Sequence, residues 1–196
     1  MDFSVKTATL AEENRLAGTV IAAFLTDPAA RWLLPEAHQY FATMPSLIKG
    51  FAGRAFANES AYHVGAYAGA ALWLPPGIHP DQDTLVSLFK RDLPGDRMEN
   101  AFALFDQMGN YHPEEPYWYL PLIGVDPVHQ GRGYGSSLME HALQRCDREQ
   151  KLAYLESSNP RNLSLYIRHG FKIIGTIQVA DSPPLFPMLR KPRTSR

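Results

Sequence analysis

The sequence has few of the features that mark disulfide-bonded, exported or membrane-spanning proteins. It contains one cysteine, Cys146, in 196 residues, so an intramolecular disulfide is excluded and nothing favours an oxidising compartment. Its longest weakly polar run, Gly65 to Leu74, is far shorter than the roughly 20 residues that a transmembrane helix needs. No basic segment leads into an apolar stretch after Met1, so no export signal is expected. These observations predict a cytoplasmic protein that does not bind membranes.

The sequence also lacks an excess of charge of either sign. Nineteen Lys and Arg residues oppose twenty Asp and Glu residues, for a formal net charge of -1, which gives no broad reason to bind nucleic acid. The basic residues near the C-terminus are interpreted as a solvated tail. The seven histidines are scattered without the spacing of metal ligands, so no metal site is expected. A small-molecule partner is favoured, and the protein is expected to be a monomer or a homodimer.

The first 110 residues show helical spacing interrupted by one hairpin pattern. The segment Thr9 to Glu12 fits a capping box, which predicts a helix that ends at Asp27-Pro28. A second helix is expected after Pro35. Small, aromatic and aliphatic residues from Ala61 to Leu74 predict a β-hairpin that turns near residues 67–69, and residues 81–110 predict two short helices.

The last eighty residues alternate strand and helix patterns. The predicted strands are Tyr117 to Val125, Leu152 to Glu156 and Phe171 to Val179, and the predicted helices are Ser136 to Gln150 and Arg161 to His169. This rhythm predicts an α/β (α+β) fold with parallel pairing, in a single domain over residues 1–196. Cys146 lies on the inner face of the longer helix and is interpreted as a core residue.

Three alternating glycines, Gly131, Gly133 and Gly135, separate a predicted strand from a long helix. Glycine allows positive φ and close approach of the backbone, and the first turn of a helix presents free N–H groups, so the loop is suited to phosphate. A plain tight connection is the alternative. The loop also approximates the dinucleotide pattern, with Glu156 near the place of a ribose-binding acid, although the chain after it is short for a dinucleotide domain.

Two blocks resemble the GCN5-related N-acetyltransferase (GNAT) superfamily. Gln130 to Gly135 matches the Gln/Arg-x-x-Gly-x-Gly/Ala loop that binds acetyl-CoA, and Asn159 to Phe171 is similar to the Asn...Leu-Tyr-x-x-x-Gly-Phe helix of that superfamily. Weaker similarity at Trp73 to Gly77 and Glu115 to Leu120 points to the puromycin-acetyltransferase-like branch. The resemblance covers roughly residues 117–175.

The resemblance implies a mixed sheet of six to seven strands flanked by helices, in which the fourth and fifth strands splay apart and acetyl-CoA lies in the gap. It implies an N-acetyltransferase that moves an acetyl group to a primary amine of a small molecule by direct transfer in a ternary complex. Residues 117–175 would form the coenzyme-binding core, with acceptor-side elements at 10–60 and 78–116. The implied coenzyme contacts are Ile123, Gly124, Val125, Gln130, Gly131, Arg132, Gly133, Tyr134, Gly135, Ser136, Asn159, Asn162 and Tyr166.

Tyr166 is the candidate acid for the departing thiolate, since the resemblance places its phenol near the sulfur. Its ordinary pKa of about 10, against about 8.5 for a thiol, suits hydrogen bonding or late proton donation. Glu115 is the candidate base, with His112 and Glu156 as alternatives. The alternative to an enzyme is a non-catalytic module that binds or senses acyl-CoA.

Overall fold

A seven-stranded mixed sheet runs through the protein in the computed structural model, which describes residues 3–193. The strand order is β1-β2-β3-β4-β5-β7-β6, and neighbours are antiparallel except for the parallel pair β4 and β5. The strands are β1 (Val5–Thr7), β2 (Ala61–Val64), β3 (Gly69–Leu74), β4 (Tyr117–Val125), β5 (Leu152–Ser157), β6 (Lys172–Ile173) and β7 (Phe186–Arg190). The fold is therefore the single mixed-sheet domain that the sequence predicts.

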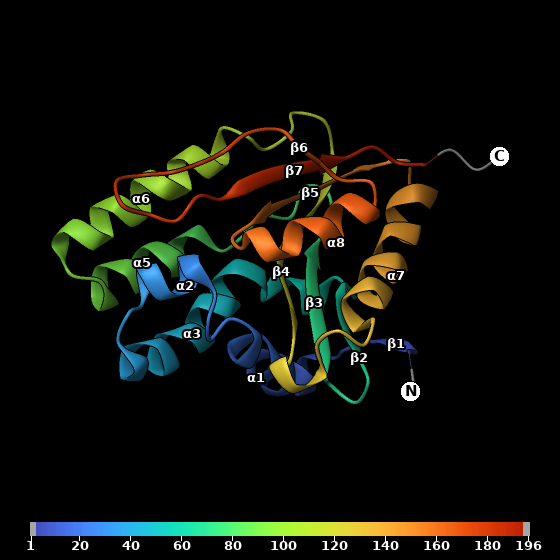
Figure 1. Ribbon diagram of the computed structural model, residues 1–196, viewed down its shortest axis with the longest axis horizontal. Helices are drawn as coiled ribbons and strands as arrows, with labels where there is room; N and C mark the ends of the chain where they lie inside the picture. Colours follow the sequence, from blue (N-terminus) through green and yellow to red (C-terminus); the bar gives the residue numbers. More distant parts are fainter. Residues whose placement is uncertain (1–2, 194–196) are drawn as a thin grey trace.

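Helices cover both faces of the sheet, and Figure 1 shows α2, α3, α5 and α6 grouped at one end of the molecule and α7 at the other. The α-helices are α1 (Glu13–Ala23), α2 (Pro28–Leu33), α3 (Ala37–Ala52), α4 (Arg54–Ala57), α5 (Gln82–Asp92), α6 (Gly95–Gly109), α7 (Tyr134–Arg148) and α8 (Leu163–Arg168). One apolar core joins α1, α3 and α5 to the first face, and a second joins α7 and α8 to the other. Cys146 is fully buried in the second core, as predicted, and burial raises its thiol pKa to about 12.

The side chains of β4 change faces in the middle of the strand. Before Pro121, Tyr119 packs in the first core and Leu120 in the second, but after it Leu122 packs in the first core and Ile123 against the second. The register with β3 shifts over the same stretch, as expected for a β-bulge. Pairing with β5 also ends there, at Tyr119. Proline cannot donate to a sheet ladder, so its position marks the place where β4 and β5 part.

The N-terminal prediction holds at the capping box, and the first helix, α1, ends at Ala23, shortly before the predicted boundary at Asp27-Pro28. The backbone N–H of Thr9 donates to the Glu12 carboxylate at 2.8 Å, and a short 3₁₀ turn leads into α1. The chain does not stay extended after Asp27, because that residue caps a new helix, α2, whose first residue is Pro28. Proline is favourable at a first helical position, so this Asp-Pro pair starts a helix as well as ending one.

The C-terminal prediction is right, within a few residues, for the first four of its five segments and wrong for most of the last. Helix α7 begins two residues before the predicted Ser136, and the predicted helix from Arg161 divides into a 3₁₀ turn, η3 (Pro160–Asn162), and α8. The predicted strand Phe171 to Val179 is wrong beyond β6. Its chain leaves the sheet where Gly175 passes so close to Tyr111 that a Cβ atom would lie 2.3 Å from the ring.

Strand β7 was not predicted, because proline interrupts its short apolar pattern. In the structure Pro187 pairs with Glu156 of β5, and β7 separates β5 from β6.

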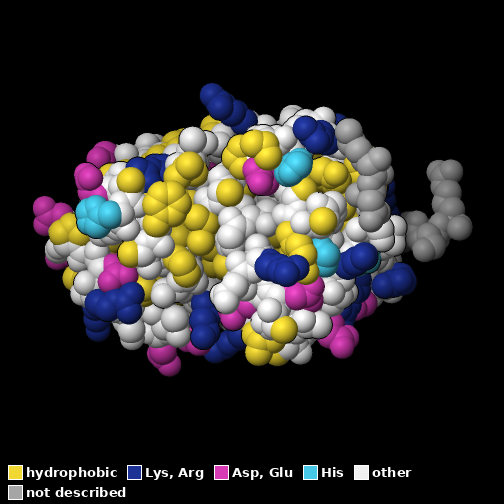
Figure 2. Space-filling model, turned by 90° about the horizontal axis from the view of Figure 1, so that it is seen from below, with side chains coloured by type: hydrophobic (Ala, Val, Ile, Leu, Met, Phe, Trp, Pro, Cys, Tyr) yellow, Lys and Arg dark blue, Asp and Glu magenta, His cyan; other side chains and the backbone are white. Residues whose placement is uncertain are grey.

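Among the described residues, no helix has the length and apolar character needed to cross a bilayer. Figure 2 shows acidic and basic side chains intermixed on one face, with hydrophobic side chains gathered between them.

Candidate active site

The glycine loop, residues 130–136, follows β4 and includes the first turn of α7. Two of its glycines have backbone conformations that other residues adopt only with strain. Gly131 has φ of +73° and Gly133, the cap of α7, has φ of +89°. The first bond of the new helix runs from the N–H of Ser137 to the Gly133 carbonyl at 3.1 Å. The N–H groups of the residues between them precede any helical partner and are available to an anion.

Most side chains of this loop are buried, exposed to solvent or hydrogen-bonded to other parts of the chain. Tyr134 is buried and packs on Gly65, Arg132 is exposed, and the Gln130 amide donates to the Val125 carbonyl at 3.1 Å. The Oγ of Ser136 lies 2.7 Å from Nε2 of His169. The loop is therefore built to present backbone, with Ser136 tied to the end of α8.

The remaining predicted coenzyme contacts on β4 lie beyond the point where β5 diverges. Ile123, Gly124 and Val125 pair with β3 on one edge, and β5 pairs with β4 only up to Tyr119. Gly124 is required by packing, because an added Cβ would lie 2.6 Å from the Cβ of Ala23 on α1. The free edge of β4 is thus held in place from the first face by α1.

The second predicted block forms the turn and helix that face this edge. Asn159 caps η3, accepting from the N–H of Arg161 at 3.1 Å, whereas the side chain of Asn162 makes no capping bond to α8. Asn162 and Tyr166 both line the cavity described next. Tyr166 is 5% exposed, and burial, with a contribution from Asp27, raises the pKa of its phenol.

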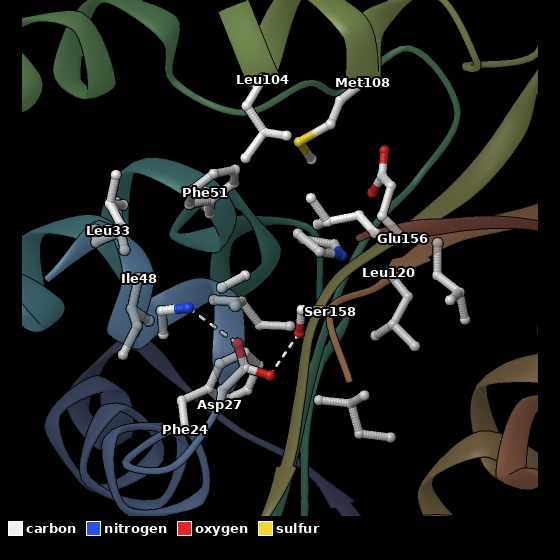
Figure 3. A pocket seen from close by; sticks show the side chains of 18 of the residues that line it. Phe24, Asp27, Leu33, Ile48, Phe51, Leu104, Met108, Leu120, Glu156 and Ser158 are labelled. Atoms are coloured by element: carbon white, nitrogen blue, oxygen red, sulfur yellow. Dashed lines mark hydrogen bonds between the residues drawn. The ribbon is translucent and has the colours of Figure 1, made fainter. Parts of the chain in front are cut away.

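An inner cavity of about 130 Å³ passes through the sheet where β4 and β5 separate (Figure 3). Its walls come from both cores, since Met44 and Leu47 belong to the first and Leu120, Leu155 and Tyr166 to the second. Most of the lining is apolar, so the few polar groups in it determine how a ligand is oriented.

Asp27 and Ser158 form a polar pair in this cavity that sequence analysis did not identify as a site. The Ser158 hydroxyl donates to Oδ2 of Asp27 at 2.6 Å, and Oδ1 accepts from the N–H of Ala30 at 3.0 Å (Figure 3). Asp27 is 5% exposed, and burial raises the pKa of its carboxyl against the lowering effect of these bonds. A buried carboxylate with a raised pKa accepts a proton more readily than an exposed one.

An outer cavity of about 590 Å³ lies beside the inner one and contains the predicted base, Glu115. Glu115 is exposed and does not line the inner cavity, so the structure does not bring it together with Tyr166. The other two candidates meet: Nε2 of His112 lies 3.1 Å from Oε1 of Glu156. His112 lines the outer cavity and Glu156 the inner one, so this pair stands in the wall between them.

Across residues 3–193, no group of three or more His, Cys, Asp and Glu side chains is placed to hold a metal ion. The candidate site combines a loop with free backbone N–H groups, a gap in the sheet, a buried carboxyl and a buried phenol. This set of groups is suited to acyl transfer between two bound molecules.

A family model described as the acetyltransferase (GNAT) family matches residues 99–171 of this chain. The matched segment contains β4, the glycine loop, α7, β5 and α8. An uncharacterized N-acetyltransferase of Schizosaccharomyces pombe is 27% identical over 198 residues, which cover 92% of this chain and 80% of the yeast protein.

Two solved structures share the architecture over almost the whole chain. A structure described as histone acetyltransferase HPA2 and related acetyltransferase from Corynebacterium glutamicum has a TM-score of 0.70 and 26% identity, covering 98% of this chain and 97% of its own. A polyamine N-acetyltransferase of Drosophila melanogaster, which forms N-acetylagmatine, has a TM-score of 0.69 and 15% identity, with 96% and 99% covered. The second likeness shows the fold alone.

Proposed function

Because this chain carries an N-acetyltransferase domain of the GNAT family, we propose that it moves the acetyl group of acetyl-CoA to a primary amine of a small molecule. The transfer is direct, within a ternary complex, because the only cysteine, Cys146, is buried in the core. The observation that carries the proposal is the meeting of Asp27, Ser158 and Tyr166 in the gap between β4 and β5.

The residues at the glycine loop fit the pyrophosphate of acetyl-CoA. At Gly131 an added Cβ would meet no atom within 4 Å, so the loop is open toward solvent, and its positive φ is the feature that requires glycine. The amides that begin α7 then face an anion, and the helix dipole contributes about 0.3–1 kcal/mol for a nearby negative charge. The exposed Arg132 adds a positive charge beside them.

Asp27 and Ser158 would remove the proton from the amine. Acetyl-CoA supplies an acetyl group activated as a thioester, and the amine must be neutral to attack it. The Ser158 oxygen accepts a proton from the amine as its own hydroxyl proton passes to Oδ2 of Asp27, so one proton leaves the nitrogen and one arrives on the carboxylate. Glu115 in the outer cavity remains a predicted base, which the variant Glu115→Gln tests by the same assay.

Tyr166 acts at the leaving group. Its raised pKa keeps the phenol protonated over the ordinary working range, so it donates a hydrogen bond to the developing thiolate rather than transferring its proton early. Its side chain lies on the wall of the inner cavity, close to Asp27. A donor that is held ready in this way stabilises charge as it appears.

A small acceptor is supported by the size and lining of the inner cavity, which is narrow and largely apolar. The Drosophila neighbour acts on small amines, whereas the Corynebacterium structure is described with histone acetyltransferases, so the assay includes both kinds of acceptor. The segment from Trp73 to Gly77 supports the proposed puromycin-acetyltransferase-like branch of the superfamily. The balanced charge and the single buried thiol support the proposed cytoplasmic location.

The direct test is release of thiol from acetyl-CoA in the presence of primary alkylamines, arylalkylamines and a lysine-containing peptide. We expect release with at least one small amine and a raised unfolding temperature with acetyl-CoA alone. Stabilisation by acetyl-CoA without release for any acceptor would instead support the non-catalytic acyl-CoA module. Stabilisation by NADH but not by acetyl-CoA would support a dinucleotide site and contradict the proposal.

A further inference from the structure

We propose that the cluster of Glu156, Tyr154, Tyr119, Tyr117 and His112 is a second cation subsite, and that the acceptor is a diamine or another amine with a distal basic group. This inference rests on the proposed function and specifies its substrate class. In it, one nitrogen of the acceptor is acetylated near Ser158, while the other pairs with the Glu156 carboxylate.

The cluster lies on one face of the sheet, because every second residue of a strand points to the same face and β4 and β5 are neighbours. Tyr117 and Tyr119 alternate on β4 before the bulge, and Tyr154 and Glu156 alternate on β5 in the adjacent register. His112, from the loop after α6, closes the group with ring centroids 4.7 to 5.6 Å from the three tyrosines. The result is a carboxylate surrounded by aromatic rings, which is the lining that recognises ammonium groups.

The carboxylate is buried without a permanent positive partner. The side chain of Glu156 is 3% exposed, and its hydrogen bond is made through Oε1 to His112, which is cationic only when protonated. A buried carboxylate that lacks a full counter-charge is costly, so a ligand cation that supplies one is favoured. The nearest permanent cations of the chain do not form ion pairs with it in the described residues.

A second observation indicates that a ligand group is missing from the cluster. Tyr154 is completely buried, and its hydroxyl has no hydrogen-bond partner within residues 3–193. Burial, the charge of Glu156 and the interaction of the hydroxyl with the Glu156 carboxylate raise the pKa of this phenol, so the hydroxyl lies beside that carboxylate. Buried polar groups are nearly always paired, and an ammonium with several N–H donors can bond to both oxygens.

Two members of the cluster, Tyr119 and Glu156, line the inner cavity, and their position fits an acceptor with a basic group at each end. Figure 3 shows Asp27 and Glu156 well separated, with apolar side chains such as Phe51 and Leu120 on either side of the space between them. An alkyl chain is compatible with such a lining, and the two carboxylates then meet the two nitrogens. Tyr119 lines both cavities, so a longer acceptor reaches the cluster from the open, outer side.

The test measures amine binding to the protein saturated with CoA, where no acetyl group is present and no turnover occurs. Linear diaminoalkanes of increasing length are each compared by calorimetry with the n-alkylamine of the same carbon number. We expect the best diamine to bind about tenfold more tightly than its matched monoamine, as for a charge-assisted hydrogen bond. Glu156→Gln is expected to remove this preference, and Tyr154→Phe to weaken it.

The exposed Glu99→Gln on α6 is the matched charge control and should leave the preference intact. The unfolding temperature of each variant, with and without CoA, identifies any variant that fails to fold, and Tyr154→Phe preserves the packed ring. Equal affinity for diamines and monoamines, no binding of any diamine, or a preference that survives Glu156→Gln overturns the inference. Thiol release with monoamines reports separately on the proposed function, which can hold in each of those cases.

Discussion

The two ends of the gap between β4 and β5 are built in different ways. At the coenzyme end, the loop from Gln130 to Ser136 presents backbone amides, and its side chains are exposed, buried or bonded elsewhere. At the acceptor end, side chains from α2, β5 and the segment after β5 meet in one cavity. The first end depends on a local conformation, and the second depends on the assembly of distant segments.

This difference indicates which substitutions each end tolerates. A backbone site withstands the loss of any one side chain but not of the glycine conformations that shape it. In a site made of side chains, removing one functional atom removes the chemistry, because no other group occupies the same position. The following variants test this contrast, beginning with the largest expected effect.

Asp27→Asn should reduce kcat by roughly 10³-fold, because an amide can still accept the capping bond from Ala30 but cannot accept a proton. The matched control is Asp81→Asn, since Asp81 caps α5 in the same way, accepting from Thr84 at 3.1 Å, and does not line the inner cavity. Steady-state kinetics with a saturating acceptor measure the effect. Equal rates for the Asp27 variant and the wild type would assign Asp27 to capping alone.

Tyr166→Phe should lower kcat by about 10²-fold with little change in the KM for acetyl-CoA, since the hydroxyl acts on charge that develops during the reaction. Phenylalanine preserves the packing of the ring between α8 and the sheet. Tyr62→Phe, another buried tyrosine in the same core, is the control. A loss of equal size in both variants would indicate a general packing defect.

Gly133→Ala should raise the KM for acetyl-CoA about tenfold, because a side chain at φ of +89° costs about 1–2 kcal/mol and distorts the cap of α7. Gly18→Ala in α1 gives the opposite expectation, a slight gain in stability, since nothing lies within 4 Å of its added Cβ. Calorimetric titration with CoA distinguishes the two glycines. Unchanged affinity in the Gly133 variant would show that the loop does not hold the coenzyme.

The smallest effect is expected in the pH dependence of stability. The pKa of Asp27 is raised in the folded state, chiefly by burial, so its contribution is fully present below the unfolded pKa of about 3.9 and is lost as the pH rises through the folded pKa. Urea unfolding at a series of pH values should therefore show wild type losing stability relative to Asp27→Asn over that window. Parallel curves for the two proteins would contradict the raised pKa.

Local patterns were sufficient to predict the strand and the loop that we propose to hold the coenzyme. The strand Tyr117 to Val125 and the alternating glycines are contiguous features whose conformations follow from their own residues. The acceptor end was not predictable in this way. Asp27 and Ser158 are 131 residues apart, and each has an ordinary local explanation, as a helix boundary and as a loop serine.

Two structural features that were not predicted, the bulge at Pro121 and the burial of Glu156, involve residues that the sequence already singles out. Pro121 within an otherwise regular strand indicates a bulge or an edge, and the structure has both at that point. Glu156 was named as a possible base and as a possible ribose ligand, but its burial among tyrosines depends on the register of β4 with β5. Strand pairing between distant segments is a property of the whole chain, so no local pattern encodes it.

The bulge at Pro121 also makes β4 sensitive to changes in chain length. If β4 kept regular alternation from Tyr119 onward without the bulge, Ile123 and Val125 would turn toward α1, onto the side now occupied by Leu122 and Gly124. The helix could no longer lie against the strand as it does beside Gly124. One extra residue thus sets which side chains of β4 face each core, so we expect a one-residue insertion between Leu122 and Val125, which reverses the facing of the residues after it, to abolish activity even where the protein still folds.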